Sequence, residues 1–357
     1  MNLRIARQVR LVGFAFVVNL WGCSASNINS QASFHSDEDF SGAPEAARPW
    51  THLKFLNDPD DFQFSIITDR TGGHRPGVFP AILKKVNLLR PEFVMSVGDY
   101  IEGYVTDKQV LSSEWREIDD MVDQLEAPLF FVVGNHDVAN DESAELWKER
   151  SGRAYYHFLY KNVLFIALST EDPPPALAPE LEKDWLINLE LYKAQGGDVA
   201  MERAKTIPGL YEYAQSIFLP AISDTQRDWA TGVVDSHPDV RWTFVFLHKP
   251  AWEYDNANFA LIEKALEGRG YTVLAGHKHD YKHTVRQGQD YMRLATTGGD
   301  MGDPATSDSM DHITWVSMSD EGPVFAHLVA TGILAKDDIP AFIPGAEFCG
   351  EYYNITC

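Results

Sequence analysis

Five short apolar runs in this chain each end in polar side chains at a predicted boundary between a strand and a loop. The runs, such as 93–97 and 242–246, are rich in β-branched and aromatic residues, which is typical of buried parallel strands. Open α/β sheets bind their ligands at the carboxyl ends of parallel strands. We therefore expect the polar residues after the runs to meet at one site. These residues are Asp69, Asp99, Asn135, His136, Asp137, His248, His277 and His279.

The residue types in this set favour a metal centre. A single Gly-Asp or a single histidine after a strand is more often an ordinary turn or a structural residue. Here, oxygen and nitrogen donors follow all five of the apolar runs, in one fixed order. Carboxylate oxygens neutralise metal ions, whereas neutral imidazoles and an amide oxygen complete the coordination shells. The set as a whole therefore indicates ligands that converge on a metal pair.

The order of these motifs resembles that of the calcineurin-like metallophosphoesterases. Gly-Asp at 98–99 is followed by Gly-Asn-His-Asp at 134–137, by His248 and by Gly-His-Lys-His at 276–279. The resemblance extends over residues 62–334 and implies an α/β (α+β) fold, a four-layer α-β-β-α sandwich. It also implies hydrolysis of phosphate mono- or diesters by a metal-bound hydroxide, with two divalent or mixed-valence ions of Mn, Fe or Zn.

The resemblance assigns a role to most of the strand-end residues. It places Asp99 between the two metals, Asn135, His248 and His277 on one ion, and Asp69 and His279 on the other. No serine or cysteine nucleophile is then needed. The resemblance makes His136 the residue that protonates the leaving alkoxide. We expect Asp137 to orient or charge that imidazole, although a helix cap is the alternative.

The chain departs from the family pattern at Thr71, where the family has a histidine ligand. Three explanations compete: His74 reaches back across two glycines, the site holds one metal, or another side chain substitutes. The purple acid phosphatases, a related branch, also lack this histidine and use a tyrosine three residues after the bridging aspartate. That position is Glu102 here, and we favour it as a ligand that makes the site harder and suited to Mn²⁺ or iron. The alternative is a solvated loop carboxylate.

Two further positions have open interpretations. Arg70 lies beside a metal-binding aspartate and is a candidate to bind substrate phosphate, although the excess of 52 acidic over 30 basic residues slightly favours the alternative of a surface ion pair. The loop at 296–300 is expected at the rim of the site. Tyr100 and Tyr104 are weaker ligand candidates than Glu102 because neither has the purple-phosphatase spacing.

The N-terminus predicts export. Arginines at 4, 7 and 10 precede an apolar stretch at 11–20, which is too short to span a membrane and is typical of a signal peptide over 1–22. Leu-Trp-Gly-Cys at 20–23 resembles a bacterial lipobox, so Cys23 is predicted to carry a lipid anchor, with a flexible tether over 23–50. We therefore expect the protein in the bacterial periplasm or cell envelope, and by analogy with lipoprotein sorting Ser24 favours anchoring to the outer membrane. Simple secretion without a lipid is the alternative.

The remaining cysteines, Cys349 and Cys357, are predicted to form a disulfide in the tail at 336–357, because export leads to an oxidising compartment. Two free thiols are the alternative. Between tether and tail, residues 51–335 are expected to form one enzyme domain. Its last segments, 291–295, 313–318 and 323–329, alternate in polarity and are expected to be antiparallel strands.

An insertion at about 170–223 interrupts the expected strand order and is predicted to form a helical cap beside the active site. Its aromatic side chains either bind an apolar or ring-bearing leaving group or pack the insertion onto the core. They are Trp185, Tyr192, Tyr211, Tyr213 and Phe218.

The net charge of −22 argues against a nucleic-acid surface, because such surfaces gather lysine and arginine. The sequence therefore predicts an exported, metal-dependent phosphoesterase with a phosphate-ester substrate. A one-metal or weakly active hydrolase, and a surface binding protein without turnover, are the alternatives.

Overall fold

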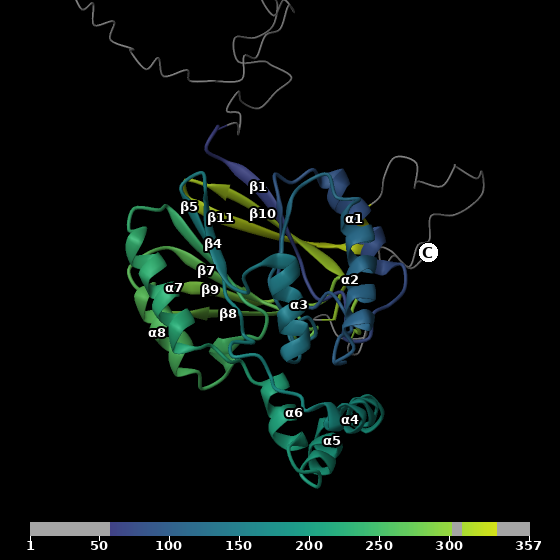
Figure 1. Ribbon diagram of the computed structural model, residues 1–357. Coiled ribbons are helices and arrows are strands. Elements are labelled where there is room, and N and C mark those ends of the chain that lie inside the picture. Colours follow the sequence, from purple (N-terminus) through teal and green to yellow (C-terminus); the bar gives the residue numbers. More distant parts are fainter. Residues whose placement is uncertain (1–57, 302–308, 334–357) are drawn as a thin grey trace, which may run out of the picture. The chain divides into compact units, whose positions relative to one another are not determined.

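The computed structural model describes residues 58–301 and 309–333, and the helices and strands of this part all belong to one compact unit that begins at Asp60 (Figure 1). The predicted signal peptide, the lipid site at Cys23, the tether and the Cys349–Cys357 disulfide lie outside the described residues. Across the part that is described, no helix has the length and apolar character needed to cross a membrane.

The first sheet has five strands in the order β11-β10-β1-β2-β3. Its three N-terminal strands run parallel, and β10 pairs antiparallel with both β1 and β11. The strands are β1 (Phe62–Ile67), β2 (Val94–Ser96), β3 (Leu129–Phe130), β10 (His312–Ser319) and β11 (Gly322–Val329).

The second sheet has six strands in the order β4-β5-β6-β7-β9-β8. Strands β5, β6, β7 and β9 are parallel, whereas β4 and β8 pair antiparallel at the two edges. The antiparallel strand predicted at 291–295 is instead β9 at 289–293, which is parallel to β7 and antiparallel only to β8. The strands are β4 (Tyr156–Tyr160), β5 (Val163–Ala167), β6 (Trp242–Phe246), β7 (Tyr271–Ala275), β8 (Lys282–Arg286) and β9 (Gln289–Arg293).

The two sheets pack face to face through phenylalanines. Phe64 of β1 makes edge contacts with Phe165 of β5 at 5.4 Å and with Phe244 of β6 at 5.2 Å between ring centroids. Successive side chains on a strand alternate between its faces. Phe165 faces the other sheet, so Leu164 and Ile166 on either side of it point to the outer helical layer.

Helices cover the outer face of each sheet (Figure 1). Leu83 and Val86 of α1 pack with Ile67 and Val94 of the first sheet, and Val234 of α7 and Ile262 of α8 pack on the second. The predicted four-layer sandwich is therefore confirmed. The helices are α1 (Val78–Leu89), α2 (Lys108–Val122), α3 (Asp141–Ser151), α7 (Asp224–Ser236) and α8 (Ala257–Ala265), with short 3-10 turns η2 (Ala251–Glu253) and η3 (Ala330–Gly332).

The segment between β5 and β6 carries a group of helices, called here the cap, which lies together at the bottom of Figure 1. It has its own small core around Trp185, Leu210 and Tyr213. The Tyr213 hydroxyl donates to the carbonyl of Ala139 at 2.9 Å, which ties the cap to the sandwich. The cap consists of η1 (Pro179–Leu181), α4 (Glu182–Gln195), α5 (Gly197–Ala204) and α6 (Leu210–Phe218), and lies within the predicted insertion at 170–223.

Candidate metal centre

The carboxyl ends of strands from both sheets bring the predicted ligands together. Two groups of side chains have ligand atoms within 4.8 Å of one another, and Asp99 belongs to both. The first group adds His248 and His277, and the second adds Asp69 and His279. These groups divide the residues as the sequence motifs do, with Asp99 common to both.

His248 is held so that one ring nitrogen is available to a cation. Its Nδ1 donates to the carbonyl of Val97 at 2.8 Å, and its Nε2 lies 2.9 Å from Oδ1 of Asn135 and 3.1 Å from Oδ2 of Asp99. Burial lowers the pKa of His248, but the charge of Asp99 outweighs it and raises the pKa to about 9. Since two acceptor oxygens face Nε2, the position requires a proton or a metal ion, and the donor set fits a metal.

Asp99 is buried and is held by the backbone around it. Its Oδ1 accepts from the backbone N–H of His136 at 3.0 Å. Burial disfavours the ionised carboxylate, but the nearby His248 and His136 hold the pKa of Asp99 far below its usual value. A buried carboxylate that stays ionised is suited to bridging two cations.

The second group is held in a similar way. Asp69 is fully buried, and its Oδ1 accepts from the backbone N–H of His277 at 2.8 Å. The Nε2 of His279 lies 3.4 Å from Oδ1 of Asp69, while its Nδ1 donates to the carbonyl of Asp300 at 2.5 Å. Because Nδ1 of His279 is bound to this carbonyl, its Nε2 is directed at the metal-binding group. The carbonyl of Val97 orients the ring of His248 in the same way.

Neither proposed replacement for the missing histidine lies in these groups. The Glu102 carboxylate accepts from the backbone N–H of His74 at 2.9 Å and of Gly73 at 3.3 Å, and it contacts Nδ1 of His74 at 2.9 Å. His74, in the loop that follows Thr71, and Glu102, in the loop that follows β2, therefore bind each other. Ligation by Glu102 stays a prediction.

His136 faces the pocket beside the metal groups, but a different residue orients it from the one expected. Its Nδ1 donates to the carbonyl of Glu102 at 2.7 Å, and its Nε2 lies 4.0 Å from Oδ2 of Asp99. Asp137 instead accepts from the backbone N–H groups of Asp99 and Tyr100 at 2.9 and 2.8 Å. Burial and the charge of Asp99 raise the pKa of Asp137 to about 7. Asp137 thus positions the backbone of Asp99 rather than the imidazole.

Arg70 is directed away from the pocket, in agreement with the structural alternative. Its guanidinium donates to the carbonyl of Tyr100 at 3.1 Å and pairs with Glu117, and its side chain is only 4% exposed. It does not line the pocket above the metal groups.

Tyr104 lies at the site in a positioning role that the sequence did not indicate. The amide Nδ2 of Asn135 donates to the Tyr104 hydroxyl, which turns Oδ1 of Asn135 toward His248. The ring also packs against His136 at 4.4 Å between centroids. Spacing gave no signal because Tyr104 acts through Asn135, and that contact exists only in the folded chain.

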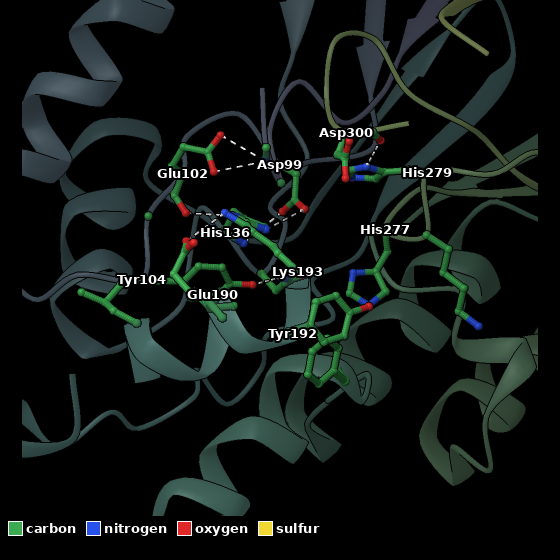
Figure 2. Close-up of a pocket in the computed structure, with 18 of the residues that line it drawn as sticks. Asp99, Glu102, Tyr104, His136, Glu190, Tyr192, Lys193, His277, His279 and Asp300 are labelled. Carbon is green, nitrogen blue, oxygen red and sulfur yellow. Dashed lines mark hydrogen bonds and ion pairs between the residues drawn. The ribbon is translucent and has the colours of Figure 1, made fainter. Parts of the chain in front are cut away.

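A pocket of about 980 Å³ opens over the metal groups. Figure 2 shows Asp99, His279 and Asp300 at the top of the view, with Tyr192 of the cap below them. The pocket therefore has a wall of metal-binding and catalytic candidates and a second wall from the cap. Its lining includes Glu102, Tyr104, Asn135, His136, His277, Leu186, Leu189, Lys193, Phe218 and Lys278.

Residues 51–281 match the family model of the calcineurin-like phosphoesterases, and the chain belongs to this family. The fold is similar to that of a dimetal phosphatase from Danio rerio, at 16% identity and a TM-score of 0.51, over 75% of this chain and 96% of that one.

Two other solved structures are more distant. The GAP50 anchor of the inner membrane complex of Plasmodium has 13% identity and a TM-score of 0.47, over 77% of this chain and 86% of that one. A putative 5'-nucleotidase from Staphylococcus aureus has 13% identity and a TM-score of 0.40, over 78% and 56%. Among the curated proteins, none matches this chain in sequence.

Proposed function

We propose that this protein hydrolyses phosphate esters at a centre of two metal ions, with His136 as the acid for the leaving group. The observation that carries the proposal is the pair of ligand groups that share the buried carboxylate of Asp99 and face one pocket. Membership of the calcineurin-like phosphoesterase family supports a metal-dependent phosphoesterase in general.

The residues that would hold the ions are those of the two groups, with Asn135 on the side of His248. Ions bound there would supply an activated water and polarise the phosphoryl oxygens. The first group has two imidazoles, a shared carboxylate and an amide oxygen within reach, whereas the second has two carboxylates and one imidazole. Because the first group has four donors and the second has three, we expect the first site to bind its ion more tightly.

The chain supplies the proton for the leaving group. Because Nδ1 of His136 is bound to the carbonyl of Glu102, its Nε2 is the nitrogen directed at the pocket. A proton on that nitrogen would pass to the alkoxide oxygen as its bond to phosphorus breaks. The backbone N–H of His136 donates to Asp99, which fixes the acid relative to the metal groups.

The test compares metal content and ester hydrolysis in wild type, His136→Ala and Asp99→Asn, with and without added Mn²⁺. The substrates are p-nitrophenyl phosphate and bis-p-nitrophenyl phosphate, which also separate monoester from diester preference. We expect two ions per wild-type chain. His136→Ala should keep them but lose turnover by about 10²- to 10⁴-fold, the usual contribution of a general acid.

Asp99→Asn is the matched control, and it should lose metal and turnover together. Unchanged turnover in His136→Ala would refute the role of the acid. One ion per chain with turnover would instead support a mononuclear hydrolase, and metal without any turnover would support a binding protein. Export and a lipid anchor at Cys23 are a separate proposal that rests on the N-terminal sequence.

A further inference from the structure

One face of α4 forms part of the pocket wall opposite the metal groups. Leu186, Leu189, Glu190 and Lys193 line the pocket, and their spacing of three, four and seven residues places them on one side of a helix. The buried residues of α4 are Trp185 and Asn188, which point into the cap. The helix therefore presents a distinct second face to the substrate space.

That wall is apolar and aromatic at its centre. Tyr192 of α4 and Phe218 of α6 both line the pocket and stack on each other, with ring centroids 5.7 Å apart and ring planes inclined by 25°. The side chain of Tyr192 is 45% exposed and that of Leu186 is 38% exposed. Large apolar surface is thus open toward the pocket.

The wall has a firm backing. Leu189 and Phe218 also pack against the buried core of the cap, which contains Trp185 and Tyr213. Trp185 contacts Tyr213 edge-on at 4.9 Å, and Tyr213 is hydrogen-bonded to the sandwich through Ala139. Leu189 and Phe218 are fixed in this way, so they lose little side-chain freedom when a ligand packs on them.

The charges of the pocket disfavour a second phosphate. Its lysines, Lys193 and Lys278, are each paired, with Glu190 at 3.5 Å and with Glu253 at 2.9 Å. The remaining charges of the lining, apart from its imidazoles, are carboxylates, among them Asp280 and Asp300. Phosphate recognition normally uses unpaired lysine or arginine. A polyphosphate would therefore meet mostly negative charge away from the metal groups.

We propose that the wall formed by Leu186, Leu189, Tyr192 and Phe218 is the subsite for the alcohol part of the substrate, and that it selects esters of aromatic or extended apolar alcohols carrying a single phosphate group. This inference rests on the proposed function. In the reaction, the bond from phosphorus to the alcohol oxygen breaks and a bond from phosphorus to a water oxygen forms, while that water releases a proton to the solvent, from which His136 regains the proton that it gives. The alcohol leaves with a proton from His136.

Binding and turnover test this separately. Titration calorimetry on the full chain, in the presence of Mn²⁺, measures the affinities for naphthylmethylphosphonate and methylphosphonate. Neither compound has an ester bond to hydrolyse, so the subsite is tested by binding alone. We expect the naphthyl compound to bind more tightly to wild type. Tyr192→Ala and Phe218→Ala should each weaken it by about tenfold, the scale of an aromatic contact plus its buried area, and leave methylphosphonate unchanged.

Ile187→Ala is the matched control, because Ile187 lies on α4 with 46% exposure but does not line the pocket. It should change neither affinity. The same variants are then assayed with 2-naphthyl phosphate and with glycerol 2-phosphate. For each substrate, the kcat/KM of the variant is divided by the kcat/KM of wild type. The proposal would be overturned if the cap variants lost the same affinity for both phosphonates, or if Ile187→Ala lost as much affinity as they do. It would also be overturned if wild type bound ADP more tightly than the naphthyl compound.

If the phosphonates bind as expected but no ester turns over, the subsite stands and the proposed hydrolysis fails. If esters turn over while the cap variants behave as wild type, the hydrolysis stands and the subsite fails. Thermal melts of each variant show whether the cap is still folded.

Discussion

The fully buried ion pair between Lys249 and Glu171 offers a direct test of how the cap is joined to the metal centre. Lys249 directly follows His248 in the chain, and its Nζ lies 2.7 Å from Oε2 of Glu171. The same Nζ donates to the carbonyls of Ser216 and Leu219, both at 3.1 Å, at the end of α6. One ammonium group thus ties the β6 strand end to the cap.

Replacing Lys249 by methionine should destabilise the fold strongly. Burial lowers the pKa of Lys249 and raises that of Glu171, while their mutual attraction opposes both shifts. Removal of one member of a buried pair leaves an uncompensated charge, which typically costs about 3–5 kcal/mol of unfolding free energy. The double variant Lys249→Met with Glu171→Met should recover about half of that loss or more, because no charge is left buried.

The assay is urea denaturation in the presence of a chelator, which separates the ion pair from metal binding. Lys205→Met is the control, since Lys205 pairs with Glu202 on the surface and should lose less than about 1 kcal/mol. The reasoning is refuted if Lys249→Met loses no more than the surface control. A double variant with a loss equal to the sum of the single losses would also refute it, because the cycle would then contain no coupling.

Two further predictions concern backbone and pH. Gly103 has φ +59°, and a Cβ added there would overlap the carbonyl of His136. Gly103→Ala should therefore lower kcat/KM at least about tenfold by displacing His136. The control is Gly152→Ala, which is also at positive φ but has open space around it and should leave kcat/KM unchanged. Burial and the charge of His327 lower the pKa of His312 to about 3. Unfolding then takes up a proton below pH 6.5, so the stability from this group is present above pH 6.5 and lost as the pH falls toward 3. His312→Leu should reduce the fall in unfolding free energy between pH 7 and 5 by about 2 kcal/mol in urea titrations, and parallel curves for variant and wild type would contradict the assignment.

The tertiary contacts changed the interpretation of several polar residues beside the motifs. Arg70, a candidate to bind phosphate, pairs with Glu117, which lies 47 residues further along the chain. Asp137, predicted to orient His136, binds backbone N–H groups that are 37 and 38 residues away. The contact of Tyr104 with Asn135 was not predicted because the two residues are 31 positions apart. Sequence spacing carries no information on such contacts between segments that are distant in the chain.

The sequence by itself determined the sandwich and the set of strand-end ligands. Buried parallel strands are recognisable as apolar runs, and their hydrogen bonds fix where each strand ends, so Asp69, Asp99 and His248 follow from the pattern. The sequence also indicated a helical insertion. Only the tertiary structure decided which face of α4 meets the pocket, since both faces carry apolar residues and the choice depends on how the cap packs against the sandwich.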